Sequence, residues 1–301
     1  MKIIEYIKNP RKIVFYLGLK GHYKALSDKQ FINLMYWCQF GEKINWNNPR
    51  SFNEKLQWIK LYGIDQRWQK LVDKAEAKKN VAELIGEEYI IPTLGIWDKF
   101  EDIDFGSLPN SFVLKTTHDS GGVVICRDKK NFNIAKARKK INHSLKHNYY
   151  WACRETLYKN IPPRIIAEQY IGGSDSNSLD DYKMMCFNGR FDNVLVCEGR
   201  YSERGVRFYH FDREWNFLPY VYYDDIDESI FDELRPKNFS KMIEIAETLS
   251  QGFPELRVDL YNVNGRIYFG ELTFFQAGGF DADFTKEARL ILGDKINLPI
   301  K

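Results

Sequence analysis

Alternation of apolar and polar residues predicts paired β-strands in the second half of the chain. Arg257–Phe275 is expected to form a β-hairpin, because both arms are rich in β-branched and aromatic residues and Asn264-Gly265 can supply the turn. Asp181–Arg200 shows the same pattern and turns at Asn188-Gly189. Two further apolar segments that run toward glycine pairs are expected strands: Ser111–Lys115 and Arg164–Gly173.

Helical periodicity and capping residues predict the helices. Ser51–Tyr62 begins with a capping box, since Ser51 is followed three residues later by Glu54. Asp73–Ile85 stops at Gly86, a residue typical of helix C-termini. The other expected elements are helices at Ile3–Leu19, Asp28–Phe40, Asn131–Tyr150 and Asn238–Gln251, and a short strand at Tyr89–Trp97. Residues 51–110 therefore read as a small α/β unit.

Composition indicates a soluble enzyme. Charged residues make up 28% of the 301 positions and the net charge is only +3, which gives no electrostatic argument for nucleic-acid binding. No apolar run approaches the roughly 18 residues of a membrane helix, and the N-terminus lacks the pattern of a signal peptide. The five scattered cysteines contain no CxxC pair, which favours reduced thiols in the cytoplasm over disulfides or a zinc site.

The first 50 residues are basic and aromatic, and two interpretations of them stay open. Cations beside isoleucine and phenylalanine fit an interfacial helix that contacts the inner face of a membrane. The simpler alternative is a helical arm that packs on the main body and keeps its lysines solvated. The basic residues in question are Lys2, Lys8, Arg11, Lys12, Lys20 and Lys24.

The hairpin Arg257–Phe275 carries one carboxylate on each arm, Asp259 and Glu271. Their cooperation depends on the loop, because side chains alternate between the two faces of a strand. A two-residue Asn-Gly loop would put them on opposite faces. A three-residue loop with Gly265 in the left-handed conformation is expected here, because it brings both to one face.

That register has further consequences for the face of the hairpin. It makes the loop Val263-Asn264-Gly265, pairs Asn262 with Arg266 and Arg257 with Glu271, and places Asp259 and Thr273 on the same face. Two carboxylates and a guanidinium on rigid strands suit Mg²⁺ that is shared with substrate phosphates. The alternative is the outward charged face of an edge hairpin.

A lysine that ends a strand beside a glycine pair is typical of phosphate-binding segments. Lys115 closes its strand and is followed by the turn Ser120-Gly121-Gly122, so an ammonium and free backbone N–H groups can face one anion. The segment is not a Walker P-loop, because GxxxxGK[ST] is absent from the chain. An ordinary turn is the alternative.

The order of these segments along the chain resembles that of the ATP-grasp superfamily. Within the superfamily, the chain resembles the TupA-like family, which is linked to surface-polysaccharide biosynthesis. The resemblance runs from about Asn48 to the C-terminus and is carried by Phe52–Trp58 (FNEKLQW), Asp73-Lys74, Phe112–Lys115, Asp181–Lys183, Arg257–Asp259 and Phe269–Phe274 (FGELTF). It implies an α+β ATP-grasp fold in which two α+β subdomains clasp ATP. The implied parts are a basic helical arm (1–50), a small α/β subdomain (51–110), a Gly-loop lid subdomain (111–163) and a C-terminal subdomain with the metal-binding hairpin (164–301).

The resemblance also implies ATP and Mg²⁺ as ligands. The implied nucleotide contacts are Lys74, Lys115 and Lys183 at the phosphates, Ser120, Gly121 and Gly122 as a lid over them, Glu168 and the backbone of Gln169 and Ile171 at adenine, and Asp175 at the ribose. For Lys183, a cross-strand ion pair is an equally open interpretation.

The final hairpin would then be catalytic. Asp259, Glu271 and Thr273 would hold Mg²⁺, and Arg257 and Lys183 would stabilise the phosphoryl group during transfer. The chain departs from the common Glu-x-Asn pattern here, because it has Glu-Leu-Thr. A threonine hydroxyl is a weaker magnesium ligand than an amide carbonyl. If two magnesium ions bind, the position that uses Thr273 is therefore expected to hold its ion less tightly.

Substrate contacts are expected from segments outside the shared pattern. Arg200, Arg204 and Arg207 form a basic cluster that suits an anionic acceptor such as a carboxylate, with Arg200 as a catalytic residue. Solvated loop arginines are the alternative. Gln276–Asp283 is a flexible loop directly after the metal-binding strand.

These features favour an ATP-dependent carboxylate–amine ligase that works through an acyl phosphate. Its carboxylate would belong to a uronic acid or acidic amino acid of a capsule, O-antigen or teichuronopeptide precursor. The alternatives are a sugar kinase, with Asp281 or Asp283 as the base, and a glycosyltransferase, for which Asp281-Ala282-Asp283 matches a DxD motif. The set of phosphate and metal residues argues against a non-enzymatic binding module.

Overall fold

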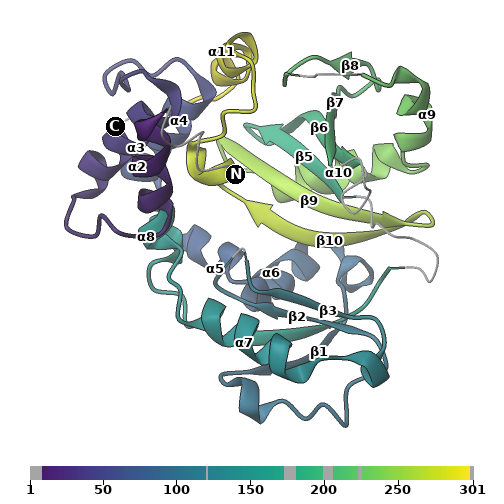
Figure 1. Ribbon diagram of the computed structural model, residues 1–301. Coiled ribbons are helices and arrows are strands. Elements are labelled where there is room, and N and C mark those ends of the chain that lie inside the picture. Colours follow the sequence, from purple (N-terminus) through teal and green to yellow (C-terminus); the bar gives the residue numbers. More distant parts are fainter. Residues whose placement is uncertain (1–8, 120, 173–180, 199–205, 223–225, 299–301) are drawn as a thin grey trace.

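The computed structural model describes residues 9–119, 121–172, 181–198, 206–222 and 226–298, and Figure 1 shows two lobes, each built on an antiparallel sheet. The first sheet has the strand order β1-β4-β2-β3 and consists of β1 (Thr93–Trp97), β2 (Phe112–Thr116), β3 (Val123–Cys126) and β4 (Ile165–Gln169). The second has the order β10-β9-β5-β6-β7-β8 and consists of β5 (Asp181–Phe187), β6 (Arg190–Glu198), β7 (Arg207–Phe211), β8 (Phe217–Leu218), β9 (Glu255–Val263) and β10 (Arg266–Thr273).

Helices surround the two sheets, so the predicted α+β class is confirmed. In chain order they are α2 (Pro10–Leu19), α3 (Asp28–Phe40), α4 (Phe52–Trp58), α5 (Gln69–Val72), α6 (Lys74–Ile85), α7 (Ile134–Leu145), α8 (Tyr150–Cys153), α9 (Phe231–Leu234), α10 (Phe239–Leu249) and α11 (Lys286–Asp294). The predicted capping box forms at α4, where Ser51 and Glu54 exchange hydrogen bonds. Among the described helices, none has the length and apolar character needed to cross a membrane.

Alternation along β9 determines which side chains reach the candidate site. Leu256, Val258 and Leu260 are fully buried in the main hydrophobic core, which lies between the six-stranded sheet and α10. Arg257 and Asp259 therefore project from the opposite face of the sheet. The hydrophobic pattern of the strand thus places its charged residues on the face away from the core.

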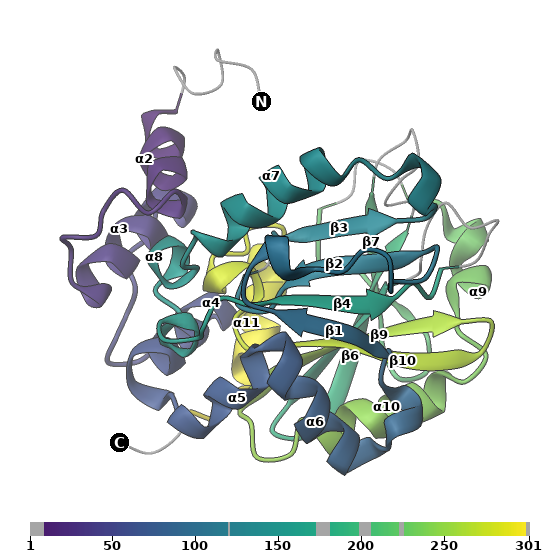
Figure 2. The same ribbon diagram turned by 90° about the horizontal axis from the view of Figure 1, so that it is seen from below.

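The four-stranded sheet follows the same rule. Phe112 and Leu114 of β2 are fully buried in a second core against α7, whose Ile141 is also buried. Lys115 lies on the other face of β2, so its ammonium points away from α7. Figure 2 shows this sheet face-on, with α7 along the β3 side and α6 along the β1 side.

The N-terminal arm packs on the body through a third core. Phe31, Ile32 and Met35 of α3 are buried there together with Phe280 from the C-terminal region. Arg154 fastens the arm, because its Nη2 donates hydrogen bonds to the carbonyls of residues 23 and 26 at 2.8 and 3.1 Å. Residues 9–50 of the arm are therefore packed against the body.

Some expected elements differ from the observed ones. The helix predicted at Asn131–Tyr150 is divided into α7 and α8, and the predicted strand Tyr89–Trp97 begins at Thr93 because Glu87–Tyr89 forms a 3-10 turn. The helix expected from Ile3 is described from Pro10 onward. The four-stranded sheet combines strands from three of the predicted subdomains: β1 from 51–110, β2 from 111–163 and β4 from 164–301. The boundaries of these subdomains stay a prediction.

Candidate active site

The β9–β10 hairpin has a different loop from the one predicted. Asn264 and Gly265 both have positive φ angles (53° and 87°), and Arg266 pairs directly with Val263. The loop therefore has two residues, and the three-residue loop with an Asn262–Arg266 pair was wrong. Gly265 is left-handed as expected, in a turn whose twist suits a tight hairpin.

A β-bulge within β10 restores the alignment that the loop alone would have lost. The register shifts between Phe269 and Glu271, so Gly270 is the extra residue. Glu271 consequently lies opposite Asp259, and Thr273 lies opposite Arg257, where Glu271 had been expected. All four polar side chains share one face, as predicted, but the bulge causes it.

Glycine at the bulge has a steric reason. A Cβ on Gly270 would lie 3.0 Å from the backbone oxygen of Asp259 and 3.1 Å from the ring of Tyr261. Both distances are tighter than ordinary van der Waals contact. A side chain at this position would push the two strands apart beside the carboxylates.

Arg257, Asp259 and Lys183 form a buried network. Arg257 grips Asp259 with two hydrogen bonds, from Nε to Oδ1 at 2.7 Å and from Nη2 to Oδ2 at 2.8 Å. Lys183 Nζ lies 2.7 Å from the same Oδ2 and 2.6 Å from Asp181 Oδ2. The cross-strand ion pair considered for Lys183 is thus present.

The network fixes the charge states of its members. Burial opposes ionisation of Asp259, but the positive charges of Arg257 and Lys183 outweigh it and lower its pKa. Burial likewise opposes the charge of Lys183, and Asp259 and Asp181 outweigh it, so its pKa is raised. Asp259 is therefore a carboxylate at neutral pH, but both of its oxygens already have cationic partners.

Glu271 is the more accessible carboxylate. Its side chain is 43% exposed, and its Oε1 lies 3.9 Å from Arg257 Nη2. Thr273 Oγ1 accepts a hydrogen bond from the same guanidinium at 3.1 Å. Across the described ranges, no three His, Cys, Asp or Glu side chains come together in a group that could hold a metal. Of the three expected metal ligands, Glu271 offers the accessible hard oxygens, while Asp259 and Thr273 would have to exchange a contact with Arg257 for one with Mg²⁺.

A second charged cluster lies on the four-stranded sheet around Glu168 of β4. Lys115 Nζ lies 2.6 Å from Oε2, and Lys78 Nζ lies 2.5 Å from Oε1. Burial disfavours the carboxylate, but Lys115 and then Lys78 outweigh it and lower the pKa of Glu168. Lys78 was missed at the sequence level, although it lies one helical turn after Lys74 in the predicted helix.

Lys74 lies where the two lobes meet. Its backbone N–H donates to the carbonyl of Thr117 after β2 at 3.1 Å, and its Nζ donates to the carbonyl of Asp119 at 2.7 Å. Asp73 caps α6 by accepting from the N–H groups of residues 75 and 76. Burial lowers the pKa of Lys74, and Glu271 is the strongest opposing charge.

Lys74 and Glu271 also line one small cavity, together with Tyr158 and Gly270. Its volume is about 10 Å³, which is room for about one water molecule. Lys74, expected at the phosphates, and Glu271, expected at the metal, therefore lie on the wall of the same cavity.

The glycine loop is held against α7. Ser144 Oγ donates to Asp119 Oδ2 at 2.5 Å and lies 2.8 Å from Thr116 Oγ1. A Cβ on Gly122 would lie 2.2 Å from Thr116 Oγ1 and 2.4 Å from Ser144 Oγ, so only glycine fits there. Gly121 has space around it, and Ser120 lies outside the described residues.

The remaining predicted site residues lie outside the two charged clusters or outside the described residues. Gln169 is exposed, and its N–H donates to the carbonyl of Pro92 at 3.0 Å, while Ile171 is half-buried. Arg207 belongs to β7 and pairs with Glu198 at 2.8 Å, so it is not a free loop arginine. The predicted contacts Asp175, Arg200 and Arg204 lie outside the described residues.

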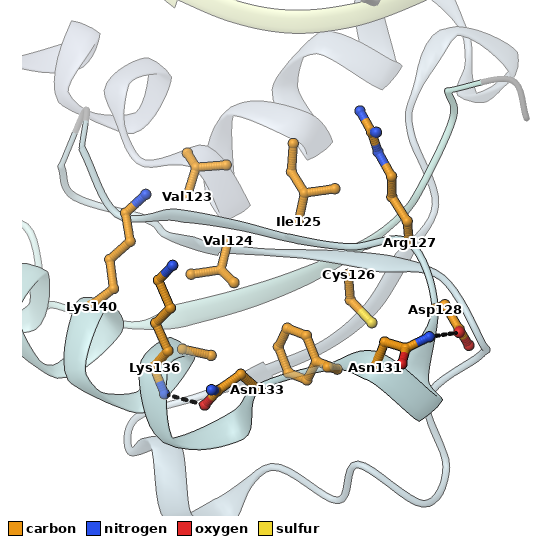
Figure 3. Close-up of a pocket in the computed structure, with 12 residues that line it drawn as sticks. Val123, Val124, Ile125, Cys126, Arg127, Asp128, Asn131, Asn133, Lys136 and Lys140 are labelled. Atoms are coloured by element: carbon orange, nitrogen blue, oxygen red, sulfur yellow. Dashed lines mark hydrogen bonds between the residues drawn. The ribbon is translucent and has the colours of Figure 1, made fainter. Parts of the chain in front are cut away.

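A larger cavity lies elsewhere, along β3 and α7 (Figure 3). It measures about 720 Å³, and Lys136 and Lys140 rise beside the strand in the close-up. Neither the hairpin network nor the Glu168 cluster contributes to its walls. Cavity size alone therefore does not identify the chemistry of this protein.

Comparison with known families decides the assignment. The model of the family described as TupA-like ATPgrasp matches residues 54–297, most of the chain. The chain belongs to this family. The predicted resemblance and the ATP-grasp fold are thereby confirmed, while none of the curated proteins compared with the chain matches it.

Solved ATP-grasp proteins are distant from this TupA-like protein. D-alanine–D-alanine ligase from Helicobacter pylori has 10% identity and a TM-score of 0.45, over 82% of this chain and 71% of that one. The ATP complex of the Bacillus anthracis enzyme has 15% identity and a TM-score of 0.39, over 81% and 65%. The ATP-grasp ligase PsnB, with Mg and ADP, has 10% identity and a TM-score of 0.43, over 80% and 63%. The assignment accordingly rests on the family match.

The FNEKLQW segment of this TupA-like protein has a structural role that the sequence did not reveal. Its side chains bind backbone carbonyls of η8 (Gln276–Gly279) and of the residues that follow. Asn53 Nδ2 donates to the carbonyls of Gly279 and Asp281 at 3.2 and 3.0 Å, and Gln57 Nε2 donates to that of Gly278 at 3.1 Å. Two residues after the segment, Lys60 Nζ donates to the carbonyls of Gly278 and Cys153 at 2.5 and 3.0 Å.

The anchored loop connects to the hairpin network. Ala277, Gly278 and Gly279 all have positive φ angles, and Gln276 accepts from Arg257 Nη1 at 3.4 Å and donates to Asp281 at 2.5 Å. The N–H groups of Gly278 and Phe280 donate within the same loop, to the carbonyls of Phe275 and Ala277 at 2.8 and 3.1 Å. The expected flexible loop is thus a rigid one, fixed beside Arg257.

Proposed function

We propose that this TupA-like protein is an ATP-dependent carboxylate–amine ligase that works through an acyl phosphate and releases ADP and phosphate. The observation that carries the proposal is the meeting of two charged clusters. Lys74, Lys115 and Glu168 come from one lobe, and Lys183, Arg257 and the hairpin carboxylates come from the other. Four cations and a pair of hard carboxylate ligands suit a magnesium-bound triphosphate held between the sheets.

In the proposed reaction, a carboxylate oxygen of the substrate attacks the γ-phosphorus and the bond to ADP breaks. An amine nitrogen then attacks the acyl carbon, loses a proton, and expels phosphate that keeps the former carboxylate oxygen. Arg257 and Lys183 would hold the oxygens of the transferring group, and Lys74 and Lys115 would hold the phosphates that remain on ADP. Mg²⁺ bound at Asp259, Glu271 and Thr273 would neutralise charge on the β- and γ-oxygens.

The two substrates are proposed by class. Surface-polysaccharide biosynthesis, the context of the resemblance, suggests a uronic-acid or acidic amino-acid carboxylate and an amino compound. The rigid loop after β10 contacts Arg257 through Gln276, which supports it as the place where the acceptor is bound. The proposed setting is the cytoplasm, at the inner face of the membrane.

A sugar kinase remains the second candidate because of one observation. Burial, with help from the nearby Asp281, raises the pKa of Asp283, as a base that takes a hydroxyl proton requires. Asp281 itself accepts from Gln276 and from the N–H of Asp283. A glycosyltransferase would use the same pair to hold a metal, but its reaction would consume a sugar nucleotide and no ATP.

Oxygen-18 in the carboxylate of the acceptor separates these reactions. Candidate uronic acids and acidic amino acids, with amine donors and ATP, are incubated with the protein and analysed by mass spectrometry and phosphorus NMR. A ligase transfers one labelled oxygen to inorganic phosphate and forms an amide. A phosphorylated sugar with ADP and no free phosphate would establish the kinase and overturn the ligase proposal.

A further inference from the structure

The outward face of α2 is both basic and apolar. Lys12, Ile13, Tyr16 and Lys20 follow one another at helical spacing, so they share a face. Ile13 is 40% exposed and Tyr16 is 46% exposed, although the opposite face of α2 already packs on α3. Trp37 of α3 adds another large exposed ring, at 43%.

Cations lie over the exposed rings. Arg11 lies 5.6 Å from the ring centroid of Trp37, and Lys20 lies 5.4 Å from that of Tyr16. Lys24, in the turn after α2, stacks in the same way at 5.3 Å on Trp151 of the body. Aromatic rings with ammonium or guanidinium groups beside them suit the boundary between water and lipid.

The charge of this arm exceeds that of the whole protein. Residues 9–40 contain five lysines and arginines and one acid, a net charge of +4, whereas the complete chain carries +3. The single acid, Asp28, accepts from Tyr150 and pairs with Arg154, so it is engaged toward the body. Lys12 and Lys20 are about 12 Å apart along the helix axis. Such a spread fits many separate anionic groups on a surface better than one small anion.

We infer that the outward face of α2, with Trp37, docks on an anionic lipid bilayer. Lysine and arginine side chains contact headgroup phosphates, while Ile13, Tyr16 and Trp37 enter the interfacial layer. Figure 2 shows α2 at an outer corner of the molecule, away from both sheets. A bilayer at this corner would not cover the place where the two lobes meet, and the inference does not depend on the proposed reaction.

Vesicle sedimentation with the full chain tests this surface. The probes are vesicles of phosphatidylcholine alone and vesicles with about one-third phosphatidylglycerol, in about 0.1 M salt. The protein is expected to sediment with the anionic vesicles only, and to dissociate as salt rises. Reversal of two charges in the Lys12→Glu/Lys20→Glu variant should weaken partitioning by about tenfold or more. The Ile13→Ser/Tyr16→Ser variant should weaken it too, with the net charge unchanged.

A matched variant controls for net charge. Lys237 precedes α10 and Lys241 lies in its first turn; both are exposed, and their reversal changes the net charge equally. In both views α10 lies far from α2. Lys237→Glu/Lys241→Glu should sediment like the wild type. Failure of the wild type to bind anionic vesicles, or unchanged binding of both α2 variants, would overturn the inference. Circular dichroism of each variant shows whether it has kept its fold.

Discussion

Asp259 and Glu271 face each other across one hairpin but have different surroundings. Asp259 is 3% exposed and neutralises both Arg257 and Lys183, whereas the Glu271 side chain is 43% exposed and touches Arg257 only loosely. Their removal should therefore have different consequences. Asp259 directly contacts Arg257 and Lys183 at 2.7 Å, whereas the ion pair of Glu271 with Arg257 is long, at 3.9 Å.

We expect Glu271→Gln to abolish magnesium-dependent ATP turnover and to change the free energy of unfolding by less than about 0.5 kcal/mol. Asp259→Asn should abolish turnover and also destabilise the fold by roughly 3–5 kcal/mol, because it leaves two buried cations underneutralised. Denaturant unfolding and a phosphate-release assay measure both quantities. Full turnover in Glu271→Gln would remove this residue from the metal site.

Glu155 provides a prediction for pH dependence. Burial raises its pKa from 4.5 to about 7, despite the opposing charge of Lys60. Because the folded protein binds this proton more tightly than the unfolded chain, the stabilising contribution is complete below pH 4.5. It is lost as the pH rises to about 7, by on the order of 3 kcal/mol.

The measurement for Glu155 is a difference between two proteins. Unfolding free energies of the wild type and of Glu155→Gln are compared at several pH values between 4.5 and 8. The stability of the wild type should fall relative to the variant up to about pH 7 and then run parallel to it. A constant difference across this range would show that Glu155 ionises normally in the folded protein.

At the scale of elements, local chemistry was predictable and long-range pairing was not. The capping box at Ser51 and the Asn188-Gly189 hairpin follow from neighbouring residues, and both formed as predicted. The bulge at Gly270 could not be predicted from neighbouring residues, because it depends on how two strands align. The anchoring of Gly278 by Lys60 joins positions 218 residues apart, so no local pattern could indicate it.

Two glycines of the hairpin allow the bulge to be tested against the turn. A Cβ at Gly265 meets nothing within 4 Å, although its φ of 87° strains any side chain, whereas one at Gly270 meets the backbone of Asp259. Gly265→Ala should cost about 1–2 kcal/mol of stability and keep turnover. Gly270→Ala should lower turnover strongly by shifting Asp259 against Glu271. Equal loss of turnover in both variants would contradict a special role for the bulge.

At the scale of the whole molecule, two lobes bring opposite charges together. The family and the α+β fold could be predicted because their sequence segments lie on strands and helix starts. The approach of Lys74 to Glu271 could not, since it depends on how the two lobes pack.

The most direct test of the central claim is calorimetric titration with a non-hydrolysable ATP analogue. The wild type should bind it with magnesium present and much more weakly with the metal chelated. Lys115→Ala removes a cation from one lobe, and Glu271→Gln removes a metal ligand from the other. Each should weaken magnesium-dependent binding tenfold or more, because the account places both at one site. No binding to the wild type, or undiminished binding to both variants, would contradict a nucleotide site between the two sheets.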